Sequence, residues 1–440
     1  MALANSAINA LHHLCEVPVL LFTYVLQCLS LRVDRQHQED AFAKAQLFYV
    51  LGLTALKQLV SIETAERLQL KAMEETNSKP AAGENESDSM NKELGFGSHE
   101  CKRHAIQELA QKRKAAILSN SIWSEHAPGV VSACKQKPPR NEETPFERIC
   151  AVMCLCNLMI VSEEFCSRNL NLLFTIVANK HEMWVVKTNI VVALGDLACV
   201  HPNLLGPYLK EPTTGFFKLL VDDDIRVRAV TIQVCSHLVL GEMLRIRDHL
   251  YTIVKLVADP DPTIAKNAET FVQNLAIKEK EKTGNLIPPL VTQLSNVMPA
   301  DKFQLALRTL LEKVEGDKPI ESLVERLCQR FEAYSEKSKK RLALARNIAF
   351  CLSELSYGSE RLVKRITSET CYQQYRLWLR DPEIFDLFKV IAAKAKRSGR
   401  VGVERRDKTV IEEWESRMLA EVGGDEKQVE EEEDVEEDSG

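Results

Sequence analysis

The stretch VDDDIRVRAVTIQVCSHLV, residues 221–239, places three aspartates and two arginines before an apolar run with helical spacing. The carboxylates of Asp222, Asp223 and Asp224 would suit a hard cation, but a calcium loop spaces its ligands at alternate positions and closes with a glutamate. An aspartate before an apolar run also supplies the oxygen that accepts a hydrogen bond from an unpaired backbone N–H at a helix start. We therefore interpret these aspartates as a helix cap and not as a metal site.

Comparable segments recur along the chain at intervals of 37 to 41 residues. Their anchor positions are Glu147, Val186, Val227, Ile264, Phe303 and Leu344. The eighth and the eleventh residue after every anchor are apolar, and these offsets lie on one stripe of an α-helix, so each segment is predicted to bury the same face. The stripe residues are Leu155, Leu158, Leu194, Leu197, Cys235, Leu238, Val272, Leu275, Leu311, Val314, Leu352 and Leu355.

A second apolar run lies between successive segments, as in NLNLLFTIV, HLYTIVKLV and ESLVERLCQRF, so each unit is predicted to be a pair of helices. A period near forty with two helices per unit is typical of HEAT-type repeats. We therefore predict an all-α fold, a HEAT-type helical-repeat solenoid. Such repeats often have an acidic residue at the inter-helix turn and a basic residue six positions later, as Asp222 and Arg228 do. In other repeats of this chain only one of the two is present: the basic residue at Lys187 and the acidic residue at Asp259.

Changes in composition divide the rest of the chain. The array is expected to begin with the sequence TPFE, where proline at the first helical position and a capping box mark a helix start. The predicted organisation is an N-terminal helical segment (1–73), a flexible polar insertion (74–100), a helix and loop connection (101–143), the HEAT-repeat array (144–397), a basic linker and short helix (398–424) and a disordered acidic tail (425–440).

The overall composition is that of a soluble protein with ample apolar surface to bury. The chain has 440 residues, of which 45% are hydrophobic and 27% charged, so two domains or one elongated array are expected. The longest apolar run near the N-terminus, residues 17–26, is too short to span a bilayer. No basic region precedes it, so we expect neither a secretory signal nor a membrane partner.

Thirteen cysteines, an odd number without paired spacing, indicate reduced thiols in the cytosol or nucleus. Cys150, Cys154, Cys156 and Cys166 cluster in the sequence, but the two-residue spacers of a zinc knuckle are missing. Cys150 and Cys154 share one helix face among apolar neighbours, where cysteine behaves as a small hydrophobe. We therefore predict core packing and not a metal site.

The chain carries no familiar catalytic motif. It has no Gly-Lys dipeptide of a P-loop and no GxSxG, HExxH or GxGxxG. Gly195, in NIVVALGDLA, is interpreted as a point where neighbouring helices approach closely and not as a ligand site. We expect a scaffold without cofactor, metal or small-molecule substrate, because helical solenoids mostly present extended binding surfaces.

Charge is unevenly distributed. Residues 425–440 carry a net charge of −9 against −6 for the whole chain, which leaves +3 on residues 1–424. This tail either attracts a basic partner such as histones or maintains solubility. A basic run precedes it, interpreted as a nuclear-import signal or nucleic-acid contact, or else as a solvated linker; it comprises Lys394, Lys396, Arg397, Arg400, Arg405, Arg406 and Lys408. A second basic set, a candidate phosphate contact that ordinary ion pairing also explains, comprises Arg226, Arg228, Arg245 and Arg247.

Six stretches resemble the HEAT-repeat regulatory subunits of condensin, of the condensin I type, and occur in that family's order. They are LFYVLGLTALKQLV (47–60), FCSRNLNLLFTIV (165–177), TNIVVALGDLA (188–198), HLVLGEMLRIRDHL (237–250), LVERLCQRF (323–331) and RNIAFCLSELSYGSERLVKRI (346–366). The resemblance covers residues 41–397 and concerns the C-terminal part of those subunits, which carry a long additional N-terminal region. The chain is therefore expected to be a fragment or a reduced subunit.

This resemblance implies a non-catalytic role in chromosome compaction. The expected partners are the kleisin and the SMC ATPase subunits of condensin, whose heads hydrolyse ATP, together with chromatin through DNA or histones. The expected location is the nucleus and the chromosome, with the interphase cytoplasm also open. Two other classes remain: a HEAT-repeat adaptor or nuclear-transport receptor, which would be recovered with transport or coat factors, and an enzyme, which would turn over ATP on its own.

Overall fold

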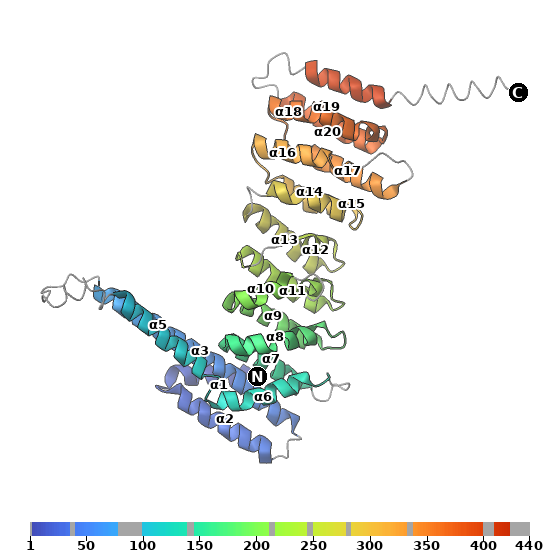
Figure 1. The fold of residues 1–440 in the computed structure, drawn as a ribbon. Helices are drawn as coiled ribbons and strands as arrows, with labels where there is room; N and C mark the ends of the chain where they lie inside the picture. Colours follow the sequence, from blue (N-terminus) through green and yellow to red (C-terminus); the bar gives the residue numbers. More distant parts are fainter. Residues whose placement is uncertain are drawn as a thin grey trace, which may run out of the picture. The chain divides into compact units, whose positions relative to one another are not determined.

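The computed structural model describes residues 2–35, 40–77, 99–138, 145–210, 216–243, 250–278, 283–331, 338–398 and 409–422. Within these ranges every regular element is an α-helix or a short 3-10 helix (Figure 1). The predicted all-α class is therefore confirmed. The chain forms two compact units, unit 1 (Met1–Val234) and unit 2 (Cys235–Gly440), and the boundary falls within helix α11 (Ile225–Leu240).

Unit 1 is organised around the long helix α3 (Ala41–Asn77), which packs along α7 (Pro145–Val161). Helix α7 packs in turn against α9 (Trp184–Val200), so the first helices of successive repeats form one layer. The other elements are α1 (Ala2–Leu14), α2 (Pro18–Arg35), α5 (His99–Ala116), α6 (Ile122–Lys135), α8 (Glu163–Ala178), α10 (Pro202–Lys210) and the 3-10 helix η1 (Phe216–Val221).

Unit 2 shows the repeat most regularly, as two layers of helices (Figure 1). The first layer contains α13 (Pro262–Lys278), α15 (Ala300–Leu311), α17 (Lys339–Glu354) and α20 (Pro382–Ser398), each in contact with the next. The second layer contains α12 (Leu250–Lys255), α14 (Thr283–Leu294), α16 (Asp317–Cys328) and α18 (Glu360–Thr367), again each in contact with the next. Short elements are η2 (Leu256–Ala258), α19 (Glu369–Tyr375), η3 (Arg376–Arg380) and a last helix over 409–422. This alternation is that of HEAT-type repeats.

The predicted apolar stripe forms the core of both units. All twelve stripe residues are buried, and none exposes more than 7% of its surface. Large side chains such as Phe271, Phe303 and Trp378 are buried as well. Because the same helix face is buried in every repeat, the repeat register predicted from the anchors is confirmed.

The aspartates of residues 222–224 form a capped turn before α11. The Asp224 carboxylate accepts a hydrogen bond from the backbone N–H of Arg226 at 2.8 Å, and Asp222 accepts one from the backbone of Asp224 at 3.0 Å. The predicted helix cap is therefore confirmed. The second oxygen of Asp222 lies 2.8 Å from Nζ of Lys187, so the same carboxylate also ties α9 to this turn.

Ion pairs between successive repeats recur at a separation of 34 or 35 residues. In unit 1, Arg148 pairs with Glu182 at 2.8 Å, and Lys187 pairs with Asp222. In unit 2, Arg346 pairs with Asp381 at 2.7 Å. Arg148 and Lys187 lie in the first turn of α7 and α9, and Arg346 lies in the middle of α17. Each acid stands just before the next first-layer helix. The sequence pattern placed acid and base within one repeat, whereas the structure shows ion pairs that join one repeat to the next.

Two glycines allow close contact between helices of unit 1. A Cβ on Gly195 would lie 2.6 Å from Cγ1 of Val234, so the predicted close approach at Gly195 is confirmed. A Cβ on Gly52 of α3 would lie 2.9 Å from Cα of Cys154 on α7. Backbone cannot move aside as a side-chain tip can, so the contact of α3 with α7 depends on glycine at this position.

Helix α3 is the one described helix long and apolar enough to cross a membrane by length and composition. Half of the most apolar window within Ala41–Glu75 is buried inside the fold, as expected for a core helix.

Parts of the predicted organisation lie outside the described residues. Helix α3 includes residues 74–77 and α5 begins at His99, so 78–98 of the predicted insertion are not described. Thr144 of the predicted capping box and residues 425–440 of the predicted acidic tail also lie outside the described residues.

Candidate functional site

Arg226, a predicted phosphate contact, is engaged within unit 1. Its guanidinium lies 2.7 Å from the Asp224 carboxylate and 3.8 Å from the centre of the Trp184 ring. The hydrogen bond from Arg226 lowers the pKa of Asp224, which keeps this carboxylate charged. An incoming phosphate would therefore have to compete with both an acid and an aromatic ring for Arg226.

Arg228 is also directed into the fold. Its Nη1 donates to the backbone carbonyl oxygen of Asp222 at 2.9 Å and so holds the turn before α11. Arg245 and Arg247, the other members of this predicted basic set, lie outside the described residues. The structure therefore brings Arg226 and Arg228 to the start of one helix, and the proposed basic ridge stays a prediction.

The basic run before the acidic tail is only partly described. Lys394 donates to the backbone carbonyl of Ser353 at the end of α17, and Lys396 pairs with Glu415 of the last helix. Arg397 is exposed. The remaining predicted contacts, Arg400, Arg405 and Arg406, lie outside the described residues, as does Lys408. Two of the three described members thus have partners within unit 2.

Arg326 of α16 and Arg330, two residues beyond the end of that helix, form a basic pair that sequence reasoning did not single out. Arg326 donates to Oδ1 of Asn285 at 2.8 Å, and Arg330 donates to Oγ1 of Thr292 at 2.9 Å. Among the described residues neither arginine has an acidic partner. Burial and the neighbouring charge of Arg326 lower the pKa of Arg330, as expected where two positive charges repel each other. The four-residue spacing of two arginines within one predicted helical run was the available signal.

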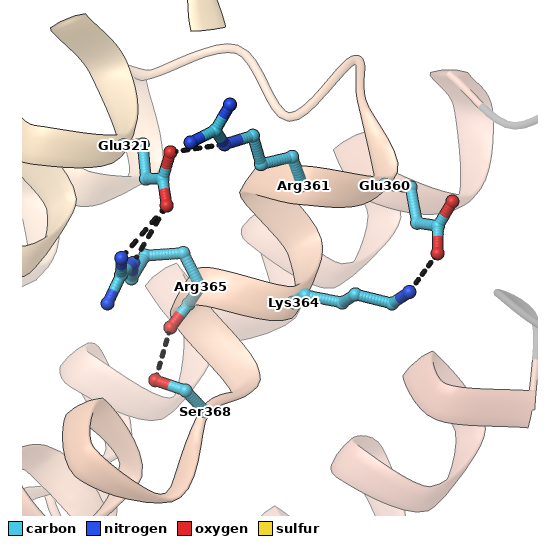
Figure 2. A pocket seen from close by; sticks show the side chains of 6 residues that line it. All are labelled: Glu321, Glu360, Arg361, Lys364, Arg365 and Ser368. Carbon is cyan, nitrogen blue, oxygen red and sulfur yellow. Dashed lines mark hydrogen bonds and ion pairs between the residues drawn. The ribbon is translucent and has the colours of Figure 1, made fainter. Parts of the chain in front are cut away.

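A charged hollow of about 380 Å³ lies where α16 meets α18 (Figure 2). Glu321 of α16 accepts from both Arg361, at 2.5 Å, and Arg365, at 2.9 Å. Lys364 pairs with Glu360 on the same helix, and Ser368 completes the lining. The two arginines lower the pKa of Glu321, with the hydrogen bond from Arg365 as the largest cause. Cations and carboxylates therefore share one small surface site.

The cysteines pack in the core as predicted. Cys150, Cys154, Cys156 and Cys166 are all buried, and burial raises the pKa of Cys150 and of Cys166 to about 11. Such thiols stay protonated and are poor nucleophiles and metal ligands. Throughout the described ranges, no group of three or more His, Cys, Asp or Glu side chains is arranged to hold a metal ion.

One cysteine pair in unit 2 differs from these core thiols. Cys328 and Cys371 share a hydrogen bond, which raises the pKa of Cys328 and lowers that of Cys371 to about 7.

Comparison with known proteins places these helices in context. A family model described as non-SMC mitotic condensation complex subunit 1 matches residues 185–353. The condensin-1 complex subunit CAP-D2 of Arabidopsis thaliana is 28% identical over 450 residues, covering 95% of this chain and 30% of that protein. The predicted resemblance to condensin subunit 1 is confirmed. Condensin complex subunit 1 of Homo sapiens is 27% identical, and that of Saccharomyces cerevisiae 22% identical, covering 94% and 81% of this chain. The chain spans about 30% of the length of these relatives.

Solved structures similar to this chain include repeat proteins made by design. An engineered protein solved by the Northeast Structural Genomics Consortium has a TM-score of 0.33 and 16% identity, covering 89% of this chain and 95% of its own. A designed armadillo repeat protein has a TM-score of 0.29 and 16% identity, covering 52% of this chain and 100% of its own. The helix layers and the buried stripe described above define the fold class of this chain.

Proposed function

We propose that this chain acts as a non-catalytic regulatory scaffold of the condensin complex in mitotic chromosome condensation. The observation that supports this role is similarity to condensin complex subunit 1 over about 95% of the chain. In this role the chain binds the kleisin and the SMC ATPase heads, which carry out ATP hydrolysis. It acts in the nucleus, on chromosomes.

The helix layers suit such a scaffold physically. Stacked helix pairs bury their apolar stripes against each other and leave long polar surfaces for partners. The buried thiols lie in the core and not in a reactive cleft. Binding without chemistry is the role that this architecture supports best.

We further propose that Arg326 and Arg330 help to engage chromatin by contacting DNA phosphates. Their hydrogen bonds go to a neutral amide and a neutral hydroxyl, so a phosphate can bind without displacing an acid. Contacts to the phosphate backbone of DNA alone give weak binding without sequence preference. The basic run from Lys394 to Arg406 is a second candidate contact, for DNA or for nuclear import.

Affinity purification of the tagged chain from mitotic cells, followed by mass spectrometry, tests the proposed function. We expect the kleisin and both SMC subunits to be recovered. Recovery of transport or coat factors without kleisin would instead favour a HEAT-repeat adaptor. A matched bait carrying Arg326→Gln and Arg330→Gln should recover the same subunits, because the proposed DNA contact is separate from subunit binding.

A further inference from the structure

The hollow between α16 and α18 is lined by a serine and by three cationic side chains (Figure 2). Ser368 stands directly after α18, is half-buried and lines the hollow together with Arg361, Lys364 and Arg365. The two remaining lining residues, Glu321 and Glu360, are the acids that pair with these cations.

The helical spacing explains why these cations and Ser368 line the same hollow. Arg361, Lys364 and Arg365 precede Ser368 by seven, four and three residues, offsets that lie on one face of a helix. The opposite face of α18 is apolar and buried through Leu362 and Ile366. The three positive charges are therefore held on the side of α18 that borders the hollow.

The Ser368 hydroxyl has a modest structural role. It donates to the backbone carbonyl of Arg365 at 2.7 Å and accepts a long hydrogen bond from the backbone N–H of Cys371 at 3.4 Å. Basic residues three and four positions before a serine are also the charge pattern by which one class of kinases selects substrates. The sequence KRITS thus combines a recognisable charge pattern with a surface turn.

We propose that Ser368 is a phosphorylation site whose phosphoryl group is held by Arg361, Lys364 and Arg365. In this reaction Oγ of Ser368 attacks the γ-phosphorus of ATP in the active site of a kinase that selects basic residues. The Oγ–P bond forms, the bond from the γ-phosphorus to the bridging oxygen breaks, and ADP leaves. The hydroxyl proton passes to the general base of the kinase.

The phosphoryl group on Ser368 competes with the Glu321 carboxylate for the arginines. A phosphoserine carries a charge of about −1.5 to −2 and three strong acceptor oxygens, whereas Glu321 offers a single negative charge. The forked guanidinium groups of Arg361 and Arg365 suit phosphate as well as carboxylate. Phosphorylation therefore draws both arginines from Glu321 and weakens the ionic link between α16 and α18.

A kinase assay on the full chain tests the site. The folded 440-residue protein is incubated with ATP and the catalytic subunit of a kinase that selects arginine at the third position before serine, and phosphate is located by mass spectrometry. We expect phosphate on Ser368 and a loss of at least about tenfold at this position in Lys364→Gln/Arg365→Gln. The matched control Thr367→Ala removes the neighbouring hydroxyl and should leave phosphorylation of Ser368 unchanged. Modification of Ser368 only in the urea-unfolded chain would overturn the proposal.

The holding of the phosphoryl group is tested by phosphorus NMR of the modified chain. Bound arginines stabilise the dianion, so the second pKa of the phosphoserine should fall below its usual value of about 6. Arg361→Gln should move that pKa back toward the value in urea, and Lys389→Gln, which removes a cation elsewhere in unit 2, should leave it unchanged. An identical pKa in the folded and unfolded chain would overturn the role of the three cations. Neither test depends on recovery of condensin subunits.

Discussion

Ionic links join neighbouring repeats in both units, but their environments differ. In unit 1 the side chains of Arg148 and Glu182 are 7% and 0% exposed. In unit 2 the side chains of Arg361 and Arg365 are 58% and 35% exposed where they meet Glu321. A buried charge that loses its partner stays desolvated, whereas an exposed charge regains water. Burial therefore decides whether an ionic link is structural or can be exchanged for a ligand.

The hydrogen bonds around the two links support this distinction. Nη1 of Arg148 donates to the backbone carbonyls of Cys134 and Gln136 at the end of α6, at 2.7 and 2.9 Å, while Nη2 meets Glu182. One guanidinium thus closes a helix end and joins two repeats. The arginines around Glu321 have no comparable set of carbonyl partners among the described residues, so their pairing can change without exposing a helix end.

The largest effect is expected from Glu182→Ala, which leaves the buried Arg148 without its acid. Removing one partner of a buried pair costs about 3–5 kcal/mol of folding stability. Urea unfolding of the full chain measures this loss. Glu164→Ala, which breaks the exposed pair with Arg168, is the matched control and should cost less than about 1 kcal/mol. Equal losses from both changes would contradict the distinction by burial.

Removing a buried apolar contact in unit 1 should reduce folding stability by a comparable amount. Leu197 on α9 is fully buried, so Leu197→Ala should destabilise the chain by about 2–5 kcal/mol. Val192 on the same helix is 47% exposed, and Val192→Ala should cost far less. Urea unfolding compares the two variants, and a small loss at Leu197 would mean that this position is not core.

A smaller effect, on DNA binding, is expected for Arg326 and Arg330. Arg326→Gln/Arg330→Gln should weaken binding to labelled duplex DNA about tenfold at low salt, because two phosphate contacts are lost. The slope of log affinity against log salt should fall by about 2. Arg226→Gln, whose arginine is held by Asp224, is the matched control. Deleting residues 425–440 should tighten binding at low salt, since the acidic tail competes for the same cations. If Arg326→Gln/Arg330→Gln leaves the affinity for DNA unchanged, these two arginines do not contact DNA.

The core could be predicted from the sequence because periodicity reports burial directly. The eighth and eleventh positions after each anchor predicted the burial of Leu197 and of the eleven other stripe residues. The aspartates before α11 predicted the helix cap at Asp224. Gly195 was recognisable as a close contact because a glycine within a helical pattern needs a packing reason.

The candidate site was less predictable because charge in a sequence does not show its partner. Arg226 and Lys396 stood out as basic residues, yet each is paired with an acid, and Glu415 is 19 residues away from Lys396. Arg326 and Arg330 were less conspicuous, since acids such as Glu325 surround them in the sequence. Only the folded arrangement shows that their hydrogen bonds go to neutral groups on α14.

The smallest effect is expected at Glu321, where the ionic link is exposed. Arg365 and Arg361 depress the pKa of this carboxyl below its ordinary value of 4.5 in the folded state. A depressed folded pKa means that the charged form favours folding, so the stabilisation is complete above the unfolded pKa and is lost as pH falls through the folded value.

The measurement compares urea midpoints of the wild-type chain and Glu321→Gln between about pH 3 and pH 7, where exposed ion pairs have small effects. The wild-type advantage should grow as pH rises through the acidic range and then level off near neutrality. In the Arg361→Gln/Arg365→Gln background the same comparison should show little dependence on pH, because the carboxyl then titrates alike in both states. An advantage that is equally large at pH 3 and pH 7 would show that Glu321 acts through packing, and the arginines would then be less available to a phosphate than the exposed geometry indicates.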